Sequence, residues 1–377
     1  MTYCFAWKYQ DAVFLIADTL VTQNIPADAD RATTSLGEPH RQLGPNEFVQ
    51  ERQLKLRELK KGVVLAFAGN VQLAIAITDF MQDNISRVKR AVDVFEMVKA
   101  SFGPFNQSRG VQILLVQGSE DGECAITKWD TDGNCEDAAH HAYIGSLAPE
   151  QADRMANLFR RLVAGESPSK EAMLLAGMAF VESLSQHEDL IAQHVGGVVC
   201  GLRVQRAKTI WPGDLIVVHH KDNFSSVAGR VSVHVREQIV YINSTYHGTI
   251  GTVLINEHSS VRTEDLIRSW NKRWFPFLKD FLSKHFTDCT RWLFINLDRQ
   301  VPLVFVVHGR LQEAADNLRI VLKKNGDCDL VLGADLWKTM QRESPPSGPE
   351  LRIVEAVDFR GTLPDGIARI GLGPGTV

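Results

Sequence analysis

The start of the chain contains two apolar runs with only a short polar connection between them, and this feature constrains the fold most. The runs cover residues 3–7 and 12–17, and the sequence KYQD joins them. Apolar runs separated by turn-forming residues predict a β-hairpin, here with strands at 2–8 and 12–17. The first residues of a domain are usually frayed, because ordering them costs conformational entropy. A core strand that begins at Thr2 therefore needs an explanation in packing or in function.

The rest of the first half alternates between groups of strands and groups of helices. Short apolar runs with turn residues between them predict two further strand pairs, and apolar residues at helical spacing follow each strand group. The predicted strands are 54–59 with 62–69, 110–118 with 123–130, 141–145 and 196–206, and the predicted helical segments are 70–102, 150–165 and 169–186.

Strands that are grouped apart from helices indicate antiparallel sheets with helices stacked on the outside. We therefore expect an α+β fold, and a four-layer αββα sandwich is one arrangement that buries both sheets. One segment departs from this plan, because residues 22–50 are polar and rich in Pro, Gly, Asp and Asn. They predict a long loop, which in a compact domain is either functional or disordered.

The character of the sequence changes at about residue 210, and we place a domain boundary there. Residues 1–209 form the first domain, and residues 210–377 form a C-terminal α/β extension whose function the sequence does not indicate. Strands are predicted at 214–220, 232–243, 248–257 and 301–309, and helices at 263–286 and 310–324. The aromatic stripe of 263–286 favours a packing face, or a contact with another subunit, over a nucleic-acid platform.

Composition limits the classes of function. The 377 residues carry a net charge of -4, which argues against a general nucleic-acid binder. No apolar run reaches the ~18 residues of a membrane-spanning helix, and Asp11 and Asp18 are unlike the basic start of a secretory signal. The six cysteines are scattered without a CxxC pair, which favours reduced thiols in the cytoplasm and argues against a structural zinc site.

Thr2 has a possible chemical reason for its place at the head of a strand. Once Met1 is removed, its hydroxyl can attack a carbonyl while its own α-amine, with a pKa near 7.7–8.0, takes up the proton. A core strand would hold such a residue rigidly. The simpler alternative is that Thr2 is a β-branched residue with good strand propensity and no chemical role.

Three further positions favour the chemical interpretation. An N-terminal nucleophile needs a nearby cation to keep its amine unprotonated, and a carboxylate to hold that cation. Asp18 ends the second predicted strand, and Lys55 lies at the start of the third, among apolar neighbours. Gly69 lies at a strand-to-helix junction, where a backbone N–H and the helix dipole can stabilise an oxyanion.

These residues resemble a known family. Thr2, the pattern D-T-x-x-T at 18–22, the lysine before an apolar residue at 55–56 and A-F-A-G at 66–69 are similar to the proteasome β-subunit family of N-terminal nucleophile hydrolases. The bacterial relatives HslV and Anbu belong to this family, and the opening MTYC followed by A-x-K is most similar to Anbu. The resemblance covers about 1–205 and implies the αββα sandwich.

The resemblance also implies a role for each matching residue. Thr2 matches the nucleophile, Lys55 the catalytic lysine, Asp18 its acidic partner and Gly69 the oxyanion-hole glycine. Ser146 matches the serine near the N-terminal amine. Two further residues match substrate-binding positions, namely Thr22, whose backbone pairs with an extended substrate, and Phe67, which shapes the specificity pocket.

The chain departs from the family pattern at several places. Asn70 replaces the second residue of the common AGG, and Leu20 replaces the arginine of the usual DSR-T. The segment between Thr22 and Lys55 is longer than in the family. The acid and serine that precede the family's GG strand have no clear match, because Asp189 lies too far before Gly196 and a histidine takes the serine's place.

The sequence therefore predicts a threonine peptidase that cleaves amide bonds without a metal or an organic cofactor. The family implies self-association into a ring or open ring, peptide or unfolded-protein substrates, and an unfoldase partner that the sequence does not identify. Two alternatives remain open: a small-amide acylase on the same fold, and an inactive scaffold or sensor. Cys4 is a less economical nucleophile, and the adjacent pairs 140–141 and 219–220 are histidines that cannot chelate one metal together.

Overall fold

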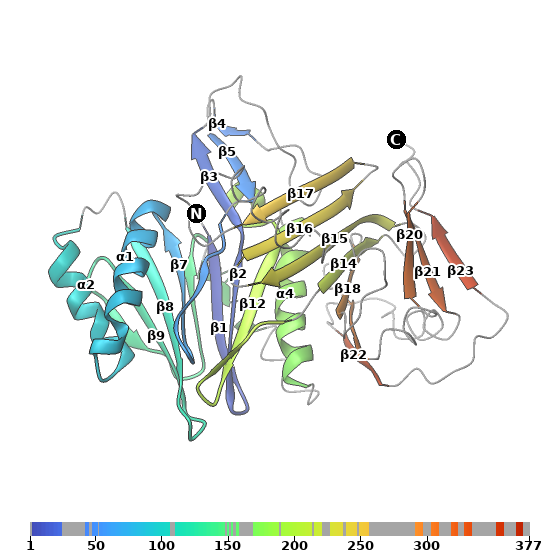
Figure 1. The fold of residues 1–377 in the computed structure, drawn as a ribbon. Helices are drawn as coiled ribbons and strands as arrows, with labels where there is room; N and C mark the ends of the chain where they lie inside the picture. The colour runs from blue at the N-terminus through green and yellow to red at the C-terminus, as the bar shows by residue number, and fades with distance from the viewer. Residues whose placement is uncertain are drawn as a thin grey trace.

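A computed structural model of the chain describes the first 220 residues most completely. The described residues are 2–24, 42–44, 47–51, 53–105, 110–147, 169–187, 190–212 and 215–220, a few positions within 149–157, and the strands between 227 and 371. In this part of the chain, no helix combines the length and the hydropathy that crossing a bilayer requires. The fold is a mixed α+β structure with two five-stranded antiparallel sheets in its N-terminal half (Figure 1).

The N-terminal hairpin lies inside the first five-stranded sheet, in the order β11-β1-β2-β12-β13. Cys4 pairs with Ala17 across the hairpin, and Val199 pairs with Asp18 on the other side of β2. Every residue of β2 is buried, as expected for a central strand with both faces covered. The strands are β1 (Tyr3–Tyr9), β2 (Ala12–Asp18), β11 (His141–Gly145), β12 (Val199–Gln205) and β13 (Lys208–Ile210).

The second five-stranded sheet has the order β10-β9-β8-β7-β6 and packs face to face with the first. Alternate residues of β7 show how it is buried on both sides: Val64 and Ala66 join the core between the sheets, whereas Leu65 and Phe67 join a cluster under α1 and α2. Its elements are β6 (Leu56–Lys60), β7 (Val63–Gly69), β8 (Val111–Gly118), β9 (Cys124–Asp130), β10 (Cys135–Asp137), α1 (Val71–Asn84) and α2 (Val94–Phe102).

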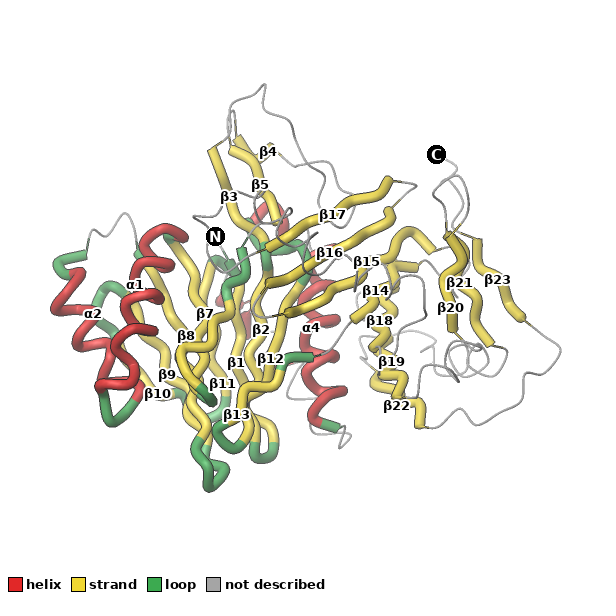
Figure 2. Tube along the Cα trace, in the orientation of Figure 1, coloured by secondary structure: helices red, strands yellow, loops and turns green. Residues whose placement is uncertain are grey.

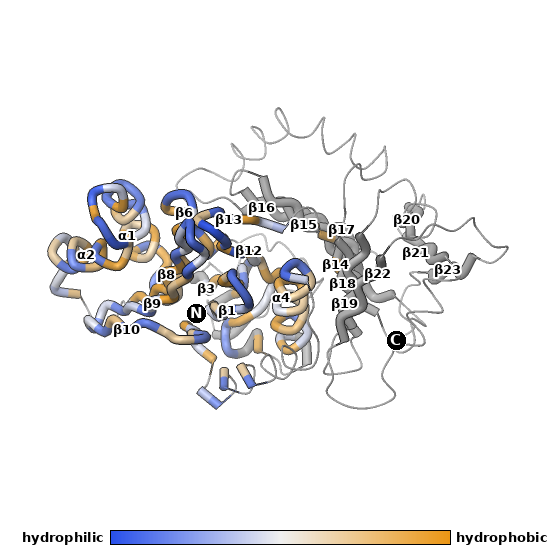
Figure 3. Tube along the Cα trace, turned by 90° about the horizontal axis from the view of Figure 1, so that it is seen from below, coloured by the Kyte–Doolittle hydropathy of each residue, from blue (hydrophilic) through white to orange (hydrophobic). Residues whose placement is uncertain are grey.

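Helix α4 (Lys170–His187) packs on the outer face of the first sheet and is itself covered from the other side. All residues from 172 to 185 are buried, and Figure 3 colours much of α4 as hydrophobic. A helix that is apolar on all sides needs neighbours all round. Strand β14 (Leu215–His220) supplies part of this cover, because Leu215 and Val217 belong to the same apolar cluster as α4.

The C-terminal half contains a seven-stranded mixed sheet in the order β17-β16-β15-β14-β18-β19-β22, and a three-stranded sheet in the order β20-β21-β23 (Figure 2). Strands β18, β19 and β22 of the larger sheet also contact α4. The bounds are β15 (Val227–Arg236), β16 (Ile239–Tyr246), β17 (Thr249–Ile255), β18 (Arg291–Asn296), β19 (Leu303–His308), β20 (Leu318–Leu322), β21 (Cys328–Gly333), β22 (Arg352–Val357) and β23 (Ile367–Gly371).

Three expectations from the sequence are wrong. The single strand expected at 232–243 is two strands, β15 and β16, which pair with each other in antiparallel fashion. The segment 22–50 is not a plain loop, because β3 (Leu20–Asn24) pairs with β5 (Glu47–Glu51), which also pairs with β4 (Gln42–Gly44). The helix expected at 310–324 is a strand over Leu318–Leu322, where pairing with β21 outweighs helical spacing. The helix expected at 263–286, and most of that at 150–165, lie outside the described residues.

A buried polar pair joins α4 to the C-terminal sheet. His219 Nε2 lies 3.0 Å from Glu182 Oε1, and both side chains are buried. We expect Glu182→Ala to lower the free energy of unfolding by about 1–3 kcal/mol, because a buried imidazole loses a hydrogen bond. Urea denaturation measures this loss, with the exposed Glu120→Ala as the matched control. Equal effects of the two variants would show that β14 does not pack on α4 in solution.

Candidate functional site

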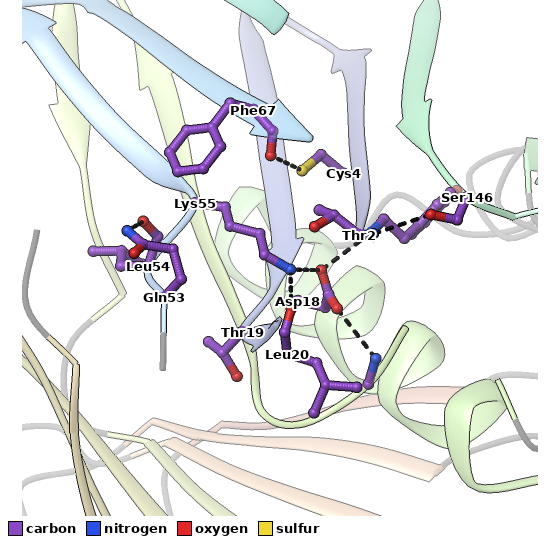
Figure 4. A network of polar contacts seen from close by, with 12 residues as sticks. Thr2, Cys4, Asp18, Thr19, Leu20, Gln53, Leu54, Lys55, Phe67 and Ser146 are labelled. Atoms are coloured by element: carbon purple, nitrogen blue, oxygen red, sulfur yellow. Dashed lines mark hydrogen bonds and ion pairs between the residues drawn. The ribbon is translucent and has the colours of Figure 1, made fainter. Parts of the chain in front are cut away.

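Thr2 is fixed by its backbone at the entrance to β1. Its nitrogen donates a hydrogen bond to Ser146 Oγ over 3.2 Å, and its carbonyl accepts one from the backbone N–H of Ser146 over 2.8 Å (Figure 4). The residue is 3% exposed. With Met1 in place this nitrogen is a peptide nitrogen, and after removal of Met1 it would be the α-amine. The hydroxyl of Ser146 therefore lies beside the group that the sequence analysis assigns as the base.

Gly145 allows this close approach of β11 to Thr2. Its φ is +117°, and a Cβ built on it would lie 1.7 Å from the carbonyl oxygen of Thr2. We expect Gly145→Ala to lower the free energy of unfolding by about 2–4 kcal/mol. This loss combines the strain of a non-glycine residue at a positive φ with the overpacking of the new Cβ against Thr2. Gly122→Ala is the matched control, because Gly122 also has a positive φ but a Cβ built on it would meet nothing within 4 Å.

Thermal or urea unfolding compares the two glycine variants. The Gly122 variant carries only the backbone strain, so the difference between the two reports the contact with Thr2. Equal losses of stability in the two variants would contradict the close approach of Gly145 to Thr2.

Lys55 and Asp18 form a fully buried ion pair next to Thr2. Lys55 Nζ lies 2.7 Å from Asp18 Oδ1, and both side chains are 0% exposed. Lys55 also donates to the backbone carbonyl of Leu20. Asp18 Oδ1 accepts a second bond from the Tyr3 N–H at 3.1 Å, and Oδ2 accepts one from the Gly196 N–H at 3.2 Å. These partners satisfy the charges that burial would otherwise disfavour.

Two opposing influences act on Asp18. Burial raises the pKa of its carboxyl group above the ordinary value, while the charge and hydrogen bond of Lys55 and the N–H groups of Tyr3 and Gly196 lower it. Specific partners rather than solvent therefore oppose the effect of burial on this carboxyl group. Any change that removes one of these partners favours protonation of Asp18.

Gly69 and Phe67 lie at the end of β7, where α1 begins. Gly69 has a φ of +103°, and Asn70 caps the helix by accepting a 2.9 Å hydrogen bond from the Leu73 N–H. This cap explains why an asparagine follows Gly69. The Phe67 side chain is buried in the cluster under α1 and α2, while its backbone N–H donates to the carbonyl of Lys55 over 3.2 Å.

Thr22 lies on β3, which continues from the Asp18 end of β2. Its backbone pairs with Val49 of β5, and its hydroxyl lies 2.7 Å from His194 Nδ1. Among the described strands, β3 pairs only with β5, and none of them pairs with its other edge. An unpaired strand edge can accept an extended peptide through backbone hydrogen bonds.

The structure thus links four of the predicted site residues by hydrogen bonds. Thr2 contacts Ser146, Asp18 contacts Lys55, and the Tyr3 N–H joins the two pairs through Asp18. A fifth, Phe67, joins them only through its backbone N–H, which donates to the carbonyl of Lys55, whereas Gly69 on β7 and Thr22 on β3 are not part of this set of bonds. Asp189 lies outside the described residues.

Two polar residues at the site were missed in the sequence analysis. Glu51 of β5 is 6% exposed, and its Oε1 accepts a 2.7 Å hydrogen bond from the Val198 N–H. Thr19 donates to the Val198 carbonyl over 2.8 Å. Thr19 could have been suspected because it directly follows Asp18. Glu51 lies in a polar segment without periodicity, so no sequence signal singles it out.

Cys4 is poorly suited to nucleophilic attack. Its Sγ lies 3.5 Å from the Phe67 carbonyl in the buried core, and burial raises the pKa of the thiol well above its ordinary value. A thiol is reactive as the thiolate, which this environment disfavours. Within the described residues, no three His, Cys, Asp or Glu side chains gather where they could hold a metal ion.

No family model matches the chain. No curated protein matches it. Among solved structures, the chain is similar to eukaryotic HslV from Trypanosoma brucei, with 14% sequence identity and a TM-score of 0.39, over 54% of this chain and 99% of that chain.

Proposed function

We propose that the chain is an N-terminal threonine hydrolase that cleaves amide bonds after removal of Met1. The observation that carries the proposal is that Asp18 Oδ1 accepts hydrogen bonds from both Lys55 Nζ and the Tyr3 N–H. The second bond comes from the peptide group that follows Thr2. A single carboxylate therefore holds the cation beside the candidate nucleophile, which is the arrangement that an activated N-terminal threonine needs.

The proposal includes the proteasome-like fold, a four-layer αββα sandwich over residues 1–209. Its support is the packing of two antiparallel sheets against each other, with α1 and α2 outside one sheet and α4 outside the other. In this proposal residues 210–377 are an extension, and their sheet covers α4 on the side away from the candidate site.

In the proposed reaction, the α-amine of Thr2 accepts the proton of Oγ1 while Oγ1 attacks the substrate carbonyl carbon. The charge of Lys55 lowers the pKa of the amine and keeps it unprotonated, and Ser146 accepts a hydrogen bond from it. The N–H groups at Gly69 and the start of α1 stabilise the oxyanion. The C–N bond then breaks, the amine product leaves with the proton, and water hydrolyses the ester at Thr2.

The proposed substrate is an extended peptide that pairs with the open edge of β3 near Thr22. Each residue added on this edge brings backbone hydrogen bonds, so turnover should rise with substrate length. A panel of aminocoumarin amides with one to four residues, beside short N-acyl amides, tests this expectation. The Thr2→Ala variant measures hydrolysis that is independent of the site.

The panel distinguishes a peptidase, an acylase and an inactive scaffold or sensor. Faster hydrolysis of the longer peptides, absent from the variant, would support the peptidase. Preference for the short N-acyl amides would replace it by an acylase on the same fold. Hydrolysis of neither class would favour an inactive scaffold or sensor.

Assembly and location are part of the same proposal. We expect self-association into a ring or an open ring, with access restricted to unfolded chains and an unfoldase partner still to be identified. Sedimentation velocity of the full chain measures the assembly. The proposed compartment is the cytoplasm, and the four cysteines whose side chains the structure describes are free thiols.

A further inference from the structure

We propose that Glu51 is a positioning residue for the Asp18–Lys55 pair, and that it acts by holding the turn at 196–198 against Asp18. This inference rests on the proposed function, because it assigns Glu51 to the support of the same site. Glu51 reaches the turn from β5, within the segment between Thr22 and Lys55 that the sequence predicts as a loop. That segment thereby becomes part of the machinery around Thr2.

Two buried side chains bind the backbone N–H and the backbone carbonyl of Val198. Glu51 Oε1 accepts the Val198 N–H at 2.7 Å, and the Thr19 hydroxyl donates to the Val198 carbonyl at 2.8 Å. Thr19 is the neighbour of Asp18 on the chain. The turn is therefore tied at one point to β5 and at another to the residue that follows the buried carboxylate.

Gly197 shows how closely Glu51 approaches the turn. A Cβ built on Gly197 would lie 2.7 Å from both Cγ and Oε1 of Glu51, and 2.9 Å from Thr19 Oγ1. The φ of Gly197 is +72°, which also favours glycine. The backbone of the turn thus lies directly against the Glu51 side chain, without space for a side chain of its own.

The turn connects Glu51 to Asp18. Gly196, two residues before Val198, donates its N–H to Asp18 Oδ2 at 3.2 Å. This bond is one of the influences that lower the pKa of Asp18 against the effect of burial. If the turn shifts, Asp18 loses this donor, its carboxylate is less stabilised, and its hold on Lys55 weakens.

The other titratable groups around Asp18 do not replace this support. Lys55, Cys4 and Cys200 lie in its electrostatic surroundings, and Glu51 lies near Cys200. Burial raises the pKa of Cys200 to about 12 and that of Cys4 further, so both are neutral thiols at working pH. Glu51 Oε1 accepts the Val198 N–H, and through this bond Glu51 acts on the turn that donates to Asp18.

Three variants of the full chain test the proposal. Glu51→Ala removes the acceptor for the Val198 N–H. Glu51→Gln keeps an oxygen acceptor of the same size and is the conservative variant. Glu96→Ala removes an exposed glutamate of α2 and is the matched control. Two measurements are made on each: hydrogen–deuterium exchange of the backbone at 194–200, and the pH-dependent rate of covalent labelling of Thr2 by a threonine-directed epoxyketone.

We expect Glu51→Ala to speed hydrogen–deuterium exchange at the backbone amides of Gly196 and Val198. We also expect it to slow the covalent labelling of Thr2 by about tenfold to a hundredfold, by lowering the maximal labelling rate and not the affinity for the reagent. In the plot of labelling rate against pH, the acid limb of Glu51→Ala should shift to higher pH than in the wild type. The reason is that Asp18 loses a hydrogen bond that favours its charged form. Glu51→Gln should restore both properties to within about threefold of the wild type. Glu96→Ala should leave them unchanged.

The two measurements separate this inference from the proposed function. Unchanged exchange at Gly196 in Glu51→Ala, or unchanged labelling with an unshifted pH profile, would overturn the positioning role. A slow Glu51→Gln variant with native exchange would also overturn it, because the acceptor alone would then be insufficient. Wild-type protein that is not labelled would overturn the proposed function, and the exchange measurement would still decide whether Glu51 holds the turn.

Discussion

Replacing Lys55 by methionine lowers the free energy of unfolding by about 3–5 kcal/mol at neutral pH. Lys55 and Asp18 are both 0% exposed, so the variant leaves a buried carboxylate without its cation. The carbonyl of Leu20 loses a donor at the same time. Methionine keeps most of the volume of the lysine stem, so the loss comes from electrostatics and hydrogen bonding rather than from a cavity. Urea denaturation followed by circular dichroism measures it.

The pH dependence of the Lys55→Met variant gives a signed test. Burial raises the pKa of Asp18 above 3.8, and without Lys55 the main opposing influence is absent. A carboxyl group whose pKa is raised in the folded state destabilises the protein above that raised pKa, and the penalty disappears below the unfolded value. The stability of the variant should therefore approach that of the wild type as the pH falls towards 3.8.

Two further variants control this prediction. Asp18→Asn combined with Lys55→Met removes both charges, so it should recover part of the loss. Lys61→Met replaces an exposed lysine on the turn between β6 and β7 and should change the free energy of unfolding by less than about 0.5 kcal/mol. Equal effects of Lys55→Met and Lys61→Met would show that Lys55 is not buried against Asp18.

Thr2→Ala is expected to reduce hydrolysis of the best peptide in the panel by about a thousandfold or more, because it removes the attacking oxygen. Thr2→Ser keeps both the hydroxyl and the α-amine, so it should retain a measurable part of the activity. The measured quantity is kcat/KM for each protein. Thermal unfolding of the same samples shows whether the fold is intact, since Thr2 contacts Ser146 only through its backbone atoms in the bonds described above.

The Thr2 prediction has a defined failure. Activity in Thr2→Ala that equals the wild type would exclude Thr2 as the nucleophile, whatever its position. A Cys4→Ala variant would then test the other candidate on β1, although burial keeps the Cys4 thiol protonated. Loss of activity in Thr2→Ser as well as Thr2→Ala, with both folded, would indicate that the methyl group positions the hydroxyl.

Local patterns in the sequence predicted much of the N-terminal half. The hairpin at 3–18 and the strand pairs β6–β7 and β8–β9 are short apolar runs with turn residues between them, and α4 is an apolar run too long for a typical strand. The ion pair between Asp18 and Lys55 could be predicted from the sequence, because each is a charged residue beside apolar neighbours. Such charges need a partner when they are buried.

The features that were missed depend on contacts between distant segments. The polar segment 22–50 has no periodicity, yet β5 forms there because β3 offers it an edge to pair with. Glu51 acquires its role only when β5 brings it to Val198, far along the chain. The burial of α4 on its second side likewise depends on strands of the C-terminal sheet, such as β14, which follows α4 in the sequence after β12 and β13.

The most direct test of the proposed mechanism is the intact mass of the purified protein after incubation with a threonine-directed epoxyketone, beside Thr2→Ala. We expect a mass without Met1 plus one covalent adduct on the wild type, and no adduct on the variant. Retention of Met1, or a processed chain that takes up no adduct, would contradict the claim that Thr2 is an activated N-terminal nucleophile.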